Sequence, residues 1–385
     1  MAFLDVFRFG FAAFFVAGHA ACVGGLLAEK ARGARATRRL ARRRESGDSV
    51  PTVSVIVPAR NEEKRIGPLL DSLRVQDYAA AEFIFIDDRS DDATARILAD
   101  FVASLPAAMG RVVTLDANPG PNFKQYALRR GIEAATGEYL LFTDADCAVS
   151  SSWISAMVAR LDDDGTGLVI GPVFKRIARR DAFHVYQAFD HAVRYMYLAA
   201  AAGLGLPCGG FGNNLIFRRS ALDAIGGYEA VPYSVTEDAA LISSVRRKTG
   251  YGIRAALEAD ARVITDPVEN VRDFVSQCLR WNNGGLFAPD PFTRIGFGAL
   301  VITISAGVLG LPACFFLPAL WPLPAAVLVS MLSNTFFAQR IAGETLPGRY
   351  FRYFPHLVFM PLYTLFLTVI GYAGVEVRWK GAKLD

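Results

Sequence analysis

Two stretches decide the fold: Thr52-Val-Ser-Val-Ile-Val57 and, further along the chain, Phe83-Ile-Phe-Ile-Asp87. Both are short runs of β-branched or aromatic residues without charge until their C-terminal ends, which is typical of buried strands. Between them, residues 62–76 have helical spacing of their apolar positions. The pattern repeats, with strand-like runs at 111–115 and 139–143 on either side of a helix-like run at 124–135. This alternation predicts an α/β domain with a mostly parallel sheet buried on both faces.

Acidic residues follow two of these strands. Asp87 and Asp88 end the second strand, and Asp144 and Asp146 follow the fourth. Parallel α/β sheets bind ligands at the carboxyl ends of their strands, so these carboxylates are candidate site residues. Asp144 and Asp146 suit a hard divalent cation, Mg²⁺ or Mn²⁺, whose other ligands are diphosphate oxygens and water. The alternatives are a helix cap formed by the acids after Asp87 and an ordinary Asp-x-Asp loop.

Two further clusters follow in the chain. Glu237-Asp238 precedes a helix-like run, and a carboxylate at a helix start is stabilised as the anion and can act as a general base. Gln277-Cys-Leu-Arg280-Trp281 lies on a helix-like stretch that starts near Val271. Its guanidinium suits a leaving diphosphate, and its indole suits a sugar or lipid acceptor. The alternatives are a helix cap for Glu237-Asp238 and an interfacial helix for 277–281.

The composition indicates a membrane protein, since 52% of the 385 residues are hydrophobic and 20% are charged. Residues 9–28 are long enough and apolar enough to span a bilayer. A signal peptide is the competing interpretation, but the positive charges follow the apolar run rather than precede it. The positive-inside rule then keeps the basic run and the central domain in the cytoplasm. Further apolar segments occur at 295–317, 321–338 and 354–375.

These features divide the chain into four parts: a transmembrane helix at 1–28, a basic juxtamembrane linker at 29–50, an α/β domain at 51–290 and a C-terminal membrane region at 291–385. The basic run is expected to contact lipid headgroups or solvent rather than nucleic acid. The spacing of the five cysteines fits neither a zinc site nor a disulfide framework. His184 and His191 lie on an apolar helix and are expected to be packed rather than to bind metal.

The order of these motifs resembles the signature of the membrane branch of glycosyltransferase family 2. The resemblance rests on the segments 53–62, 83–92, 144–146, 236–238 and 277–281 and covers a little over half of the chain. It implies a cytoplasmic domain of the GT-A fold (Rossmann-like), a nucleotide-diphosphate sugar donor, expected to be a UDP-sugar, a divalent metal and inversion at the anomeric carbon.

Carried over by position, the resemblance implies a role for each motif residue. The nucleoside is expected near Pro58, Ala59, Arg60, Glu62 and Asp88. Lys124 matches a basic residue near the donor, Asp144 is expected near the donor ribose and sugar, and Asp146 on the metal. Asp238 is the expected base. Gln277, Arg280 and Trp281 match an element shared by polysaccharide synthases and ceramide glucosyltransferases. The loop 208–213 resembles an acceptor-side loop, with a simple glycine turn as the alternative.

The acceptor is left open by the sequence. The few C-terminal segments favour a membrane lipid hydroxyl over a growing polymer, so the expected protein is an integral inner (plasma) membrane enzyme acting on a lipid. A processive polysaccharide synthase and a non-catalytic membrane scaffold are the alternatives. The basic C-terminal residues Arg378, Lys380 and Lys383 favour the cytoplasm, which predicts that one C-terminal segment, the one containing Pro361, is re-entrant or interfacial.

Overall fold

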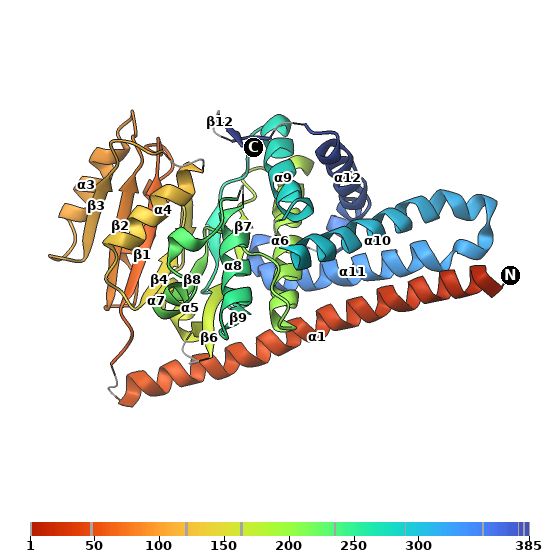
Figure 1. Ribbon diagram of the computed structural model, residues 1–385, viewed down its shortest axis with the longest axis horizontal. Helices are drawn as coiled ribbons and strands as arrows, with labels where there is room; N and C mark the ends of the chain where they lie inside the picture. Colours follow the sequence, from red (N-terminus) through yellow and green to blue (C-terminus); the bar gives the residue numbers. More distant parts are fainter. Residues whose placement is uncertain are drawn as a thin grey trace.

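The computed structural model describes residues 2–46, 49–119, 122–161, 165–234, 236–288, 290–348, 350–375, 377–379 and 382–384. A sheet-containing domain forms one end of the molecule and long helices form the other, as Figure 1 shows. Helix α1 (Ala2–Ser46) runs along both parts and connects them.

The main sheet has seven strands in the order β3-β2-β1-β4-β8-β6-β9. The strands are β1 (Val53–Ala59), β2 (Ala81–Asp87), β3 (Gly110–Thr114), β4 (Tyr139–Phe142), β6 (Thr166–Ile170), β8 (Leu215–Arg218) and β9 (Gly252–Ala255). Only β8 runs against its neighbours, β4 and β6; the other neighbours pair in parallel. The predicted mostly parallel sheet is therefore confirmed.

Helices cover both faces of this sheet, which explains why its strands are continuously apolar. Helices α2 (Gly67–Arg74), α3 (Thr94–Ala103) and α5 (Trp153–Leu161) cover one face, and α4 (Phe123–Ala134), α6 (Ala182–Gly203) and α8 (Glu237–Lys248) cover the other. Side chains along strand β1 alternate between the two faces. Val55 and Val57 pack on the face covered by α2, α3 and α5, whereas Ile56 packs on the face covered by α4, α6 and α8. Polar chemistry is thus confined to the strand ends.

A smaller sheet extends the domain toward the long helices. It contains β5 (Cys147–Val149), β10 (Val263–Thr265) and β7 (Val173–Lys175), in the order β5-β10-β7. Its register places Cys147, Thr265 and Lys175 in one row across the three strands. The helix α7 (Arg219–Ala224) and the 3-10 turn η1 (Tyr228–Ala230) complete the domain.

The C-terminal region is helical. It comprises α9 (Val271–Leu286), α10 (Pro291–Phe316), α11 (Pro322–Ala342), α12 (Phe354–Tyr372), the 3-10 turns η2 (Pro318–Leu320), η3 (Gly343–Thr345) and η4 (Tyr350–Tyr353), and the short strands β11 (Val377–Trp379) and β12 (Ala382–Leu384). In the described residues, four helices, within α1, α10, α11 with its flanking turns, and α12, are long and apolar enough to cross a membrane. Helices α10 and α11 form a hairpin beside the N-terminal part of α1 (Figure 1).

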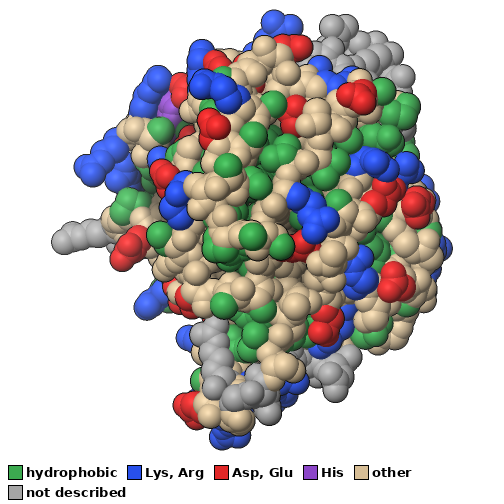
Figure 2. Space-filling view, turned by 90° about the vertical axis from the view of Figure 1, so that its left-hand side faces the viewer, with side chains coloured by type: hydrophobic (Ala, Val, Ile, Leu, Met, Phe, Trp, Pro, Cys, Tyr) green, Lys and Arg blue, Asp and Glu red, His purple; other side chains and the backbone are tan. Residues whose placement is uncertain are grey.

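The surface chemistry differs between the two ends. Large apolar side chains are exposed along α10, among them Ile302 at 69%, Phe315 at 86% and Phe316 at 90%. The opposite end of the molecule carries Lys, Arg, Asp and Glu side chains spread over its face (Figure 2). This contrast fits helices in lipid and a domain in water.

Helix α1 differs from the expected division into a spanning helix and a linker. It continues through the basic segment to Ser46 because part of that segment packs on the domain. The carboxylate of Glu29 is fully buried and pairs with Arg160 of α5 at 2.8 Å, and Leu40 is 6% exposed. The predicted helix at 62–76 begins only at Gly67, because residues 62–66 form a turn.

Helices α1 and α6 cross at two glycines. A Cβ atom on Gly25 would lie 2.2 Å from the carbonyl oxygen of Ala200, and one on Gly203 would lie 2.0 Å from the carbonyl oxygen of Gly25. Real Cβ atoms do not approach backbone so closely, so each side chain would push the helices apart. The neighbouring Gly24 has open space at its Cβ position.

We therefore expect Gly25→Ala to destabilise the protein by about 1–3 kcal/mol, as overpacking does. The matched control Gly24→Ala should be neutral or stabilise by up to about 1 kcal/mol, because alanine favours the helix. Thermal unfolding of the two variants in detergent measures the difference. Equal midpoints for both variants would show that the crossing is not tight.

Candidate active site

The parallel strands bring the predicted nucleotide loops together. Ala59 ends β1 and lies opposite Asp87, which ends β2, and the Asp88 amide donates a hydrogen bond to the Ala59 carbonyl. Pro58 is half-buried beside them. The loops are further linked by Asn61, whose side-chain oxygen accepts a bond from the Asp91 amide at 2.8 Å. The first segments of the predicted site therefore form one edge.

Side chains at this edge are held by charge and by one aromatic ring. The carboxylate of Asp88 is buried and accepts bonds from Arg89 Nε at 2.8 Å and from Asn118 Nδ2 at 2.9 Å. The guanidinium groups of Arg60 and Arg89 both lie over the ring of Phe123, at 5.8 and 5.0 Å from its centroid. Two half-buried cations thus line the place where the sequence predicts a nucleoside diphosphate.

Glu62, the last predicted nucleoside residue, takes part in a different interaction. Its carboxylate is buried and pairs with Arg65 at 2.6 Å, while the second guanidinium nitrogen of Arg65 lies 3.8 Å from Asp146. Arg65 therefore lies between Glu62 and Asp146, the predicted metal residue, and pairs with both carboxylates.

Lys124 connects the donor side to the predicted base. Its ammonium lies 2.6 Å from Asp144 Oδ1 and 3.5 Å from Glu237 Oε1. Burial alone would lower the pKa of Lys124, but the carboxylates of Asp144 and Glu237 raise it above the usual range, so the side chain is a cation at all relevant pH values. Helix α4 delivers this lysine because Asn122 caps the helix through the Gln125 amide.

Asp144 and Asp146 are about one-third exposed, at 32% and 31%, and so are accessible to a ligand. Among the described residues no group of three or more His, Cys, Asp or Glu side chains is placed to hold a metal ion. A cation at this edge would therefore take its remaining ligands from diphosphate and water. Mg²⁺ and Mn²⁺ accept such ligands, whereas a structural zinc ion requires a fuller set of protein ligands.

Asp238 is the second residue of α8 and is half-buried. Its carboxylate accepts bonds from the amides of Gly212 at 2.8 Å and Ala239 at 2.7 Å. Burial, and then the neighbouring Glu237, raise the pKa of Asp238 to about 6, while the Ala239 amide and the cations Lys124 and Arg280 oppose the shift. The carboxyl is therefore more basic than an ordinary aspartate and still ionised at neutral pH.

The loop 208–213 lies next to Asp238. The backbone amide of Gly212 donates to Asp238, and the side-chain nitrogen Nδ2 of Asn213 lies 3.5 Å from the sulfur of Cys147, the residue after Asp146. Phe211 stacks on His191, with the ring centroids 4.7 Å apart. His191 is buried and bonds the Val173 carbonyl, and His184 bonds Asp181, so both histidines are packed as expected.

The segment 277–281 lies on α9, and its first residue, Gln277, contacts Lys175, which the sequence did not indicate as a site residue. The oxygen Oε1 of Gln277 accepts a bond of 2.6 Å from Lys175 at the end of β7. Lys175 and Arg194 also lie near the ring of Trp281, at 5.6 and 5.5 Å from its centroid. The one feature of the sequence that could have indicated Lys175 is its position as the first charged residue after the apolar run 167–174.

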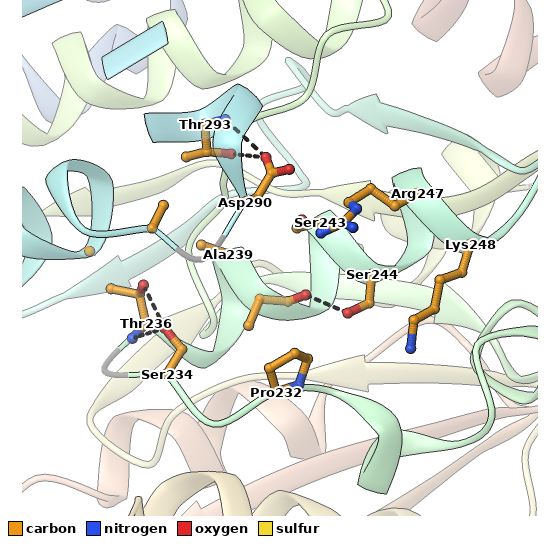
Figure 3. A pocket seen from close by; sticks show the side chains of 13 residues that line it. Pro232, Ser234, Thr236, Ala239, Ser243, Ser244, Arg247, Lys248, Asp290 and Thr293 are labelled. Carbon is orange, nitrogen blue, oxygen red and sulfur yellow. Dashed lines mark hydrogen bonds between the residues drawn. The ribbon is translucent and has the colours of Figure 1, made fainter. Parts of the chain in front are cut away.

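A pocket opens on another face of α8, shown in Figure 3. It lies between α8, the loop before it and the start of α10, and its labelled lining includes Ser243, Arg247 and Lys248 of α8. Asp290, at the start of α10, bonds Thr293 and forms an ion pair with Arg246 of α8. The helix that carries Asp238 is thereby tied to the first C-terminal membrane helix.

Comparison with a solved structure shows the fold. The mannosyltransferase PcManGT from Pyrobaculum calidifontis, solved in complex with GDP-Man and Mn²⁺, superposes with a TM-score of 0.54 at 19% identity over 93% of this chain and 99% of that chain. The likeness shows a GT-A glycosyltransferase fold.

Comparison of the sequence with models of protein families identifies the family. Residues 16–385 match the model of Glycosyl transferase family 21, and the chain belongs to that family. This confirms the resemblance to membrane glycosyltransferases, with family 21 as the family assigned.

Curated relatives match one region. The dolichyl-phosphate β-glucosyltransferase of Dictyostelium discoideum is 31% identical over 31% of this chain and 39% of its own length. The 4,4'-diaponeurosporenoate glycosyltransferase of Staphylococcus haemolyticus is 36% identical over 28% of each chain. The succinoglycan biosynthesis protein ExoO of Rhizobium meliloti is 32% identical over 32% of this chain and 33% of its own. The chain thus spans about a third of the length of these relatives.

Proposed function

We propose that this protein transfers a sugar from a nucleotide-diphosphate sugar, a UDP-sugar, to the hydroxyl of a membrane lipid with inversion at the anomeric carbon. One observation carries the proposal: Asp238, whose carboxyl is kept basic by burial, is linked through Glu237 and Lys124 to Asp144 at the donor edge. The proposed base and the proposed donor edge therefore share one network of charges.

The chemistry requires a single displacement. The acceptor oxygen attacks the anomeric carbon from the face opposite the leaving group, the bond to the diphosphate breaks, and Asp238 accepts the hydroxyl proton. Arg280 would stabilise the charge on the leaving diphosphate. Asp146, with Asp144 beside it, would hold a divalent cation that neutralises the same charge when bound.

A lipid acceptor is supported by the attachment of the site to the membrane helices. Two of the relatives act, by name, on dolichyl phosphate and on diaponeurosporenoate. Helix α9, which carries Arg280 and Trp281, is followed at once by α10, whose apolar side chains are exposed. A lipid can thus approach the site sideways with its tail in hydrocarbon.

The function is tested by incubating the purified protein in lipid nanodiscs with a panel of labelled nucleotide sugars. We expect label in the lipid extract, dependence on Mn²⁺ or Mg²⁺, and loss of at least about 100-fold in Asp238→Asn, since general-base catalysis contributes roughly 10²–10⁴. Asp146→Ala should abolish the metal response. A high-molecular-weight product would favour the processive alternative, and full activity in excess chelator would exclude the metal.

The pH dependence of kcat/KM tests the base separately. Because the raised pKa leaves Asp238 protonated below about pH 6, kcat/KM should fall about tenfold per pH unit below that value. Glu237→Gln removes the neighbouring negative charge, so its acidic limb should move to lower pH. A limb that keeps its position in Glu237→Gln would show that Glu237 does not tune the base.

We also propose that the domain faces the cytoplasm of the inner (plasma) membrane and that α12 is interfacial. Helix α12 packs against α9 and α6 through Tyr363 and Leu367, and β11 lies beside α9. With α1 crossing once and the α10–α11 hairpin crossing twice, an interfacial α12 leaves the C-terminus on the side of the domain. Of the basic C-terminal residues, Lys380 lies outside the described residues.

Single cysteines in a cysteine-free background test this arrangement in intact cells. Lys383→Cys and Glu45→Cys should resist a membrane-impermeant maleimide until the cells are permeabilised, because both would face the cytoplasm. Phe316→Cys, near the tip of the hairpin, should react from outside and serves as the control. Labelling of Lys383→Cys in intact cells would mean that α12 crosses the membrane.

A further inference from the structure

Lys175 is a buried cation next to the proposed site. It ends β7, and only 2% of its surface is exposed. In the small sheet it lies in one row with Thr265 and Cys147, the residue after Asp146. Adjacent strands are about 4.8 Å apart, so the two strand spacings between β7 and β5 separate the backbone of Lys175 from that of Cys147, the neighbour of the proposed metal residue, by roughly 10 Å.

The ammonium group of Lys175 is held by neutral groups. It donates to Gln187 Oε1 at 3.2 Å and to Gln277 Oε1 at 2.6 Å, and it lies 5.9 Å from the ring of Phe274 and 5.6 Å from that of Trp281. Within the described part of the chain, no carboxylate lies within the 4.0 Å of an ion pair with it. A lysine has three N–H donors, so one is left for another acceptor.

Nearby charges do not supply the missing anion. Asp190 pairs with Arg194 at 2.7 Å and so is neutralised locally, and Arg194 repels the lysine. Burial lowers the pKa of Lys175 to about 8, against the weaker influence of Cys278, Asp190 and the more distant Asp146. Burying a cation without an anion is costly, and methionine would fill the same space without that cost.

Gln277 and Trp281 both face this lysine. Gln277 accepts its shortest hydrogen bond, and Trp281 presents a ring to Lys175 and to Arg194 and its edge to His191, with a centroid distance of 5.1 Å. Trp281 is half-buried, and these protein groups cover part of its indole. Stacking under an acceptor, the role that the resemblance implied, is less consistent with these contacts than support of the lysine.

We propose that Lys175 binds a phosphate oxyanion of a substrate and that Gln277 and Trp281 are positioning residues that act by holding Lys175. The oxyanion belongs either to the diphosphate of the donor or to a phosphorylated lipid acceptor. The ligand supplies the anion that the buried ammonium lacks, and the third N–H group donates to it. The inference rests on the proposed function only in placing a phosphate-bearing ligand at this site.

Binding measurements test the proposal without turnover. UDP with Mn²⁺ and, separately, a polyprenyl phosphate in detergent are titrated into wild type, Lys175→Met and Lys175→Arg. Because a hydrogen bond to a charged group contributes roughly 1.5–3 kcal/mol, Lys175→Met should weaken one of the two ligands by roughly 10- to 100-fold, and Lys175→Arg should recover part of the loss. Loss confined to UDP assigns the donor, and loss confined to the lipid phosphate assigns the acceptor.

Folding is checked by thermal unfolding in the same detergent. Lys175→Met should not lower the midpoint, since it replaces a buried charge by an apolar side chain of similar size. Gln277→Glu is a second variant, which gives the ammonium an anionic partner and should compete with the phosphate. Unchanged affinity for both ligands in a folded Lys175→Met or Gln277→Glu protein would overturn the proposal.

A double-mutant cycle tests the positioning role. If Gln277 and Trp281 act through Lys175, then Gln277→Leu and Trp281→Phe should each weaken the affected ligand in the wild-type background and have little further effect in Lys175→Met. Additive effects would mean that they contact the ligand themselves. Should the wild-type protein bind either ligand but transfer no sugar, the proposed function fails while the assignment of Lys175 stands.

Discussion

The burial of both faces of the parallel sheet is the constraint on which the site depends. With α2, α3 and α5 on one face and α4, α6 and α8 on the other, polar side chains have access to ligands only at the strand ends. The loops after β1, β2 and β4 therefore carry Arg60, Asp88 and Asp144 at the same edge. The antiparallel strand β8 turns the chain back, so that the loop before it brings Gly212 to Asp238 from the opposite direction.

The domain is connected to the C-terminal and N-terminal helices at several points. Helix α1 crosses α6 at Gly25 and Gly203 and buries Glu29 against Arg160, while Arg246 of α8 pairs with Asp290 at the start of α10. Helix α9 packs against α12 and carries Arg280. Helices that carry candidate site residues, α8 and α9, thus also contact the C-terminal helical region.

Sequence patterns predicted those parts of the structure that follow from local composition. The strands and the acids at their ends could be predicted because an apolar run followed by Asp87 or Asp144 has one natural place in a parallel sheet. Packing between distant segments could not. Nothing near Lys175 in the chain indicates that Gln187 and Gln277 would converge on its ammonium, and nothing in the basic run indicates that Leu40 would be buried. The role expected of Trp281 rested on the chemistry of its indole and on the family resemblance, and neither indicated the cations beside its ring.

The electrostatic balance around Asp238 shows how a buried environment makes a carboxylate more basic. An aspartate with an ordinary pKa near 4 is ionised at neutral pH but is a weak proton acceptor, whereas a fully buried and unpaired one would be protonated. Two amide hydrogen bonds and the cations Lys124 and Arg280 stabilise the anion, while burial and Glu237 destabilise it. A pKa of about 6 leaves roughly nine-tenths of the carboxyl ionised at pH 7 while bringing its basicity close to the working pH. Glu237 contributes to this balance twice, because it raises the pKa of Asp238 directly and also pairs with Lys124, a cation that opposes the shift.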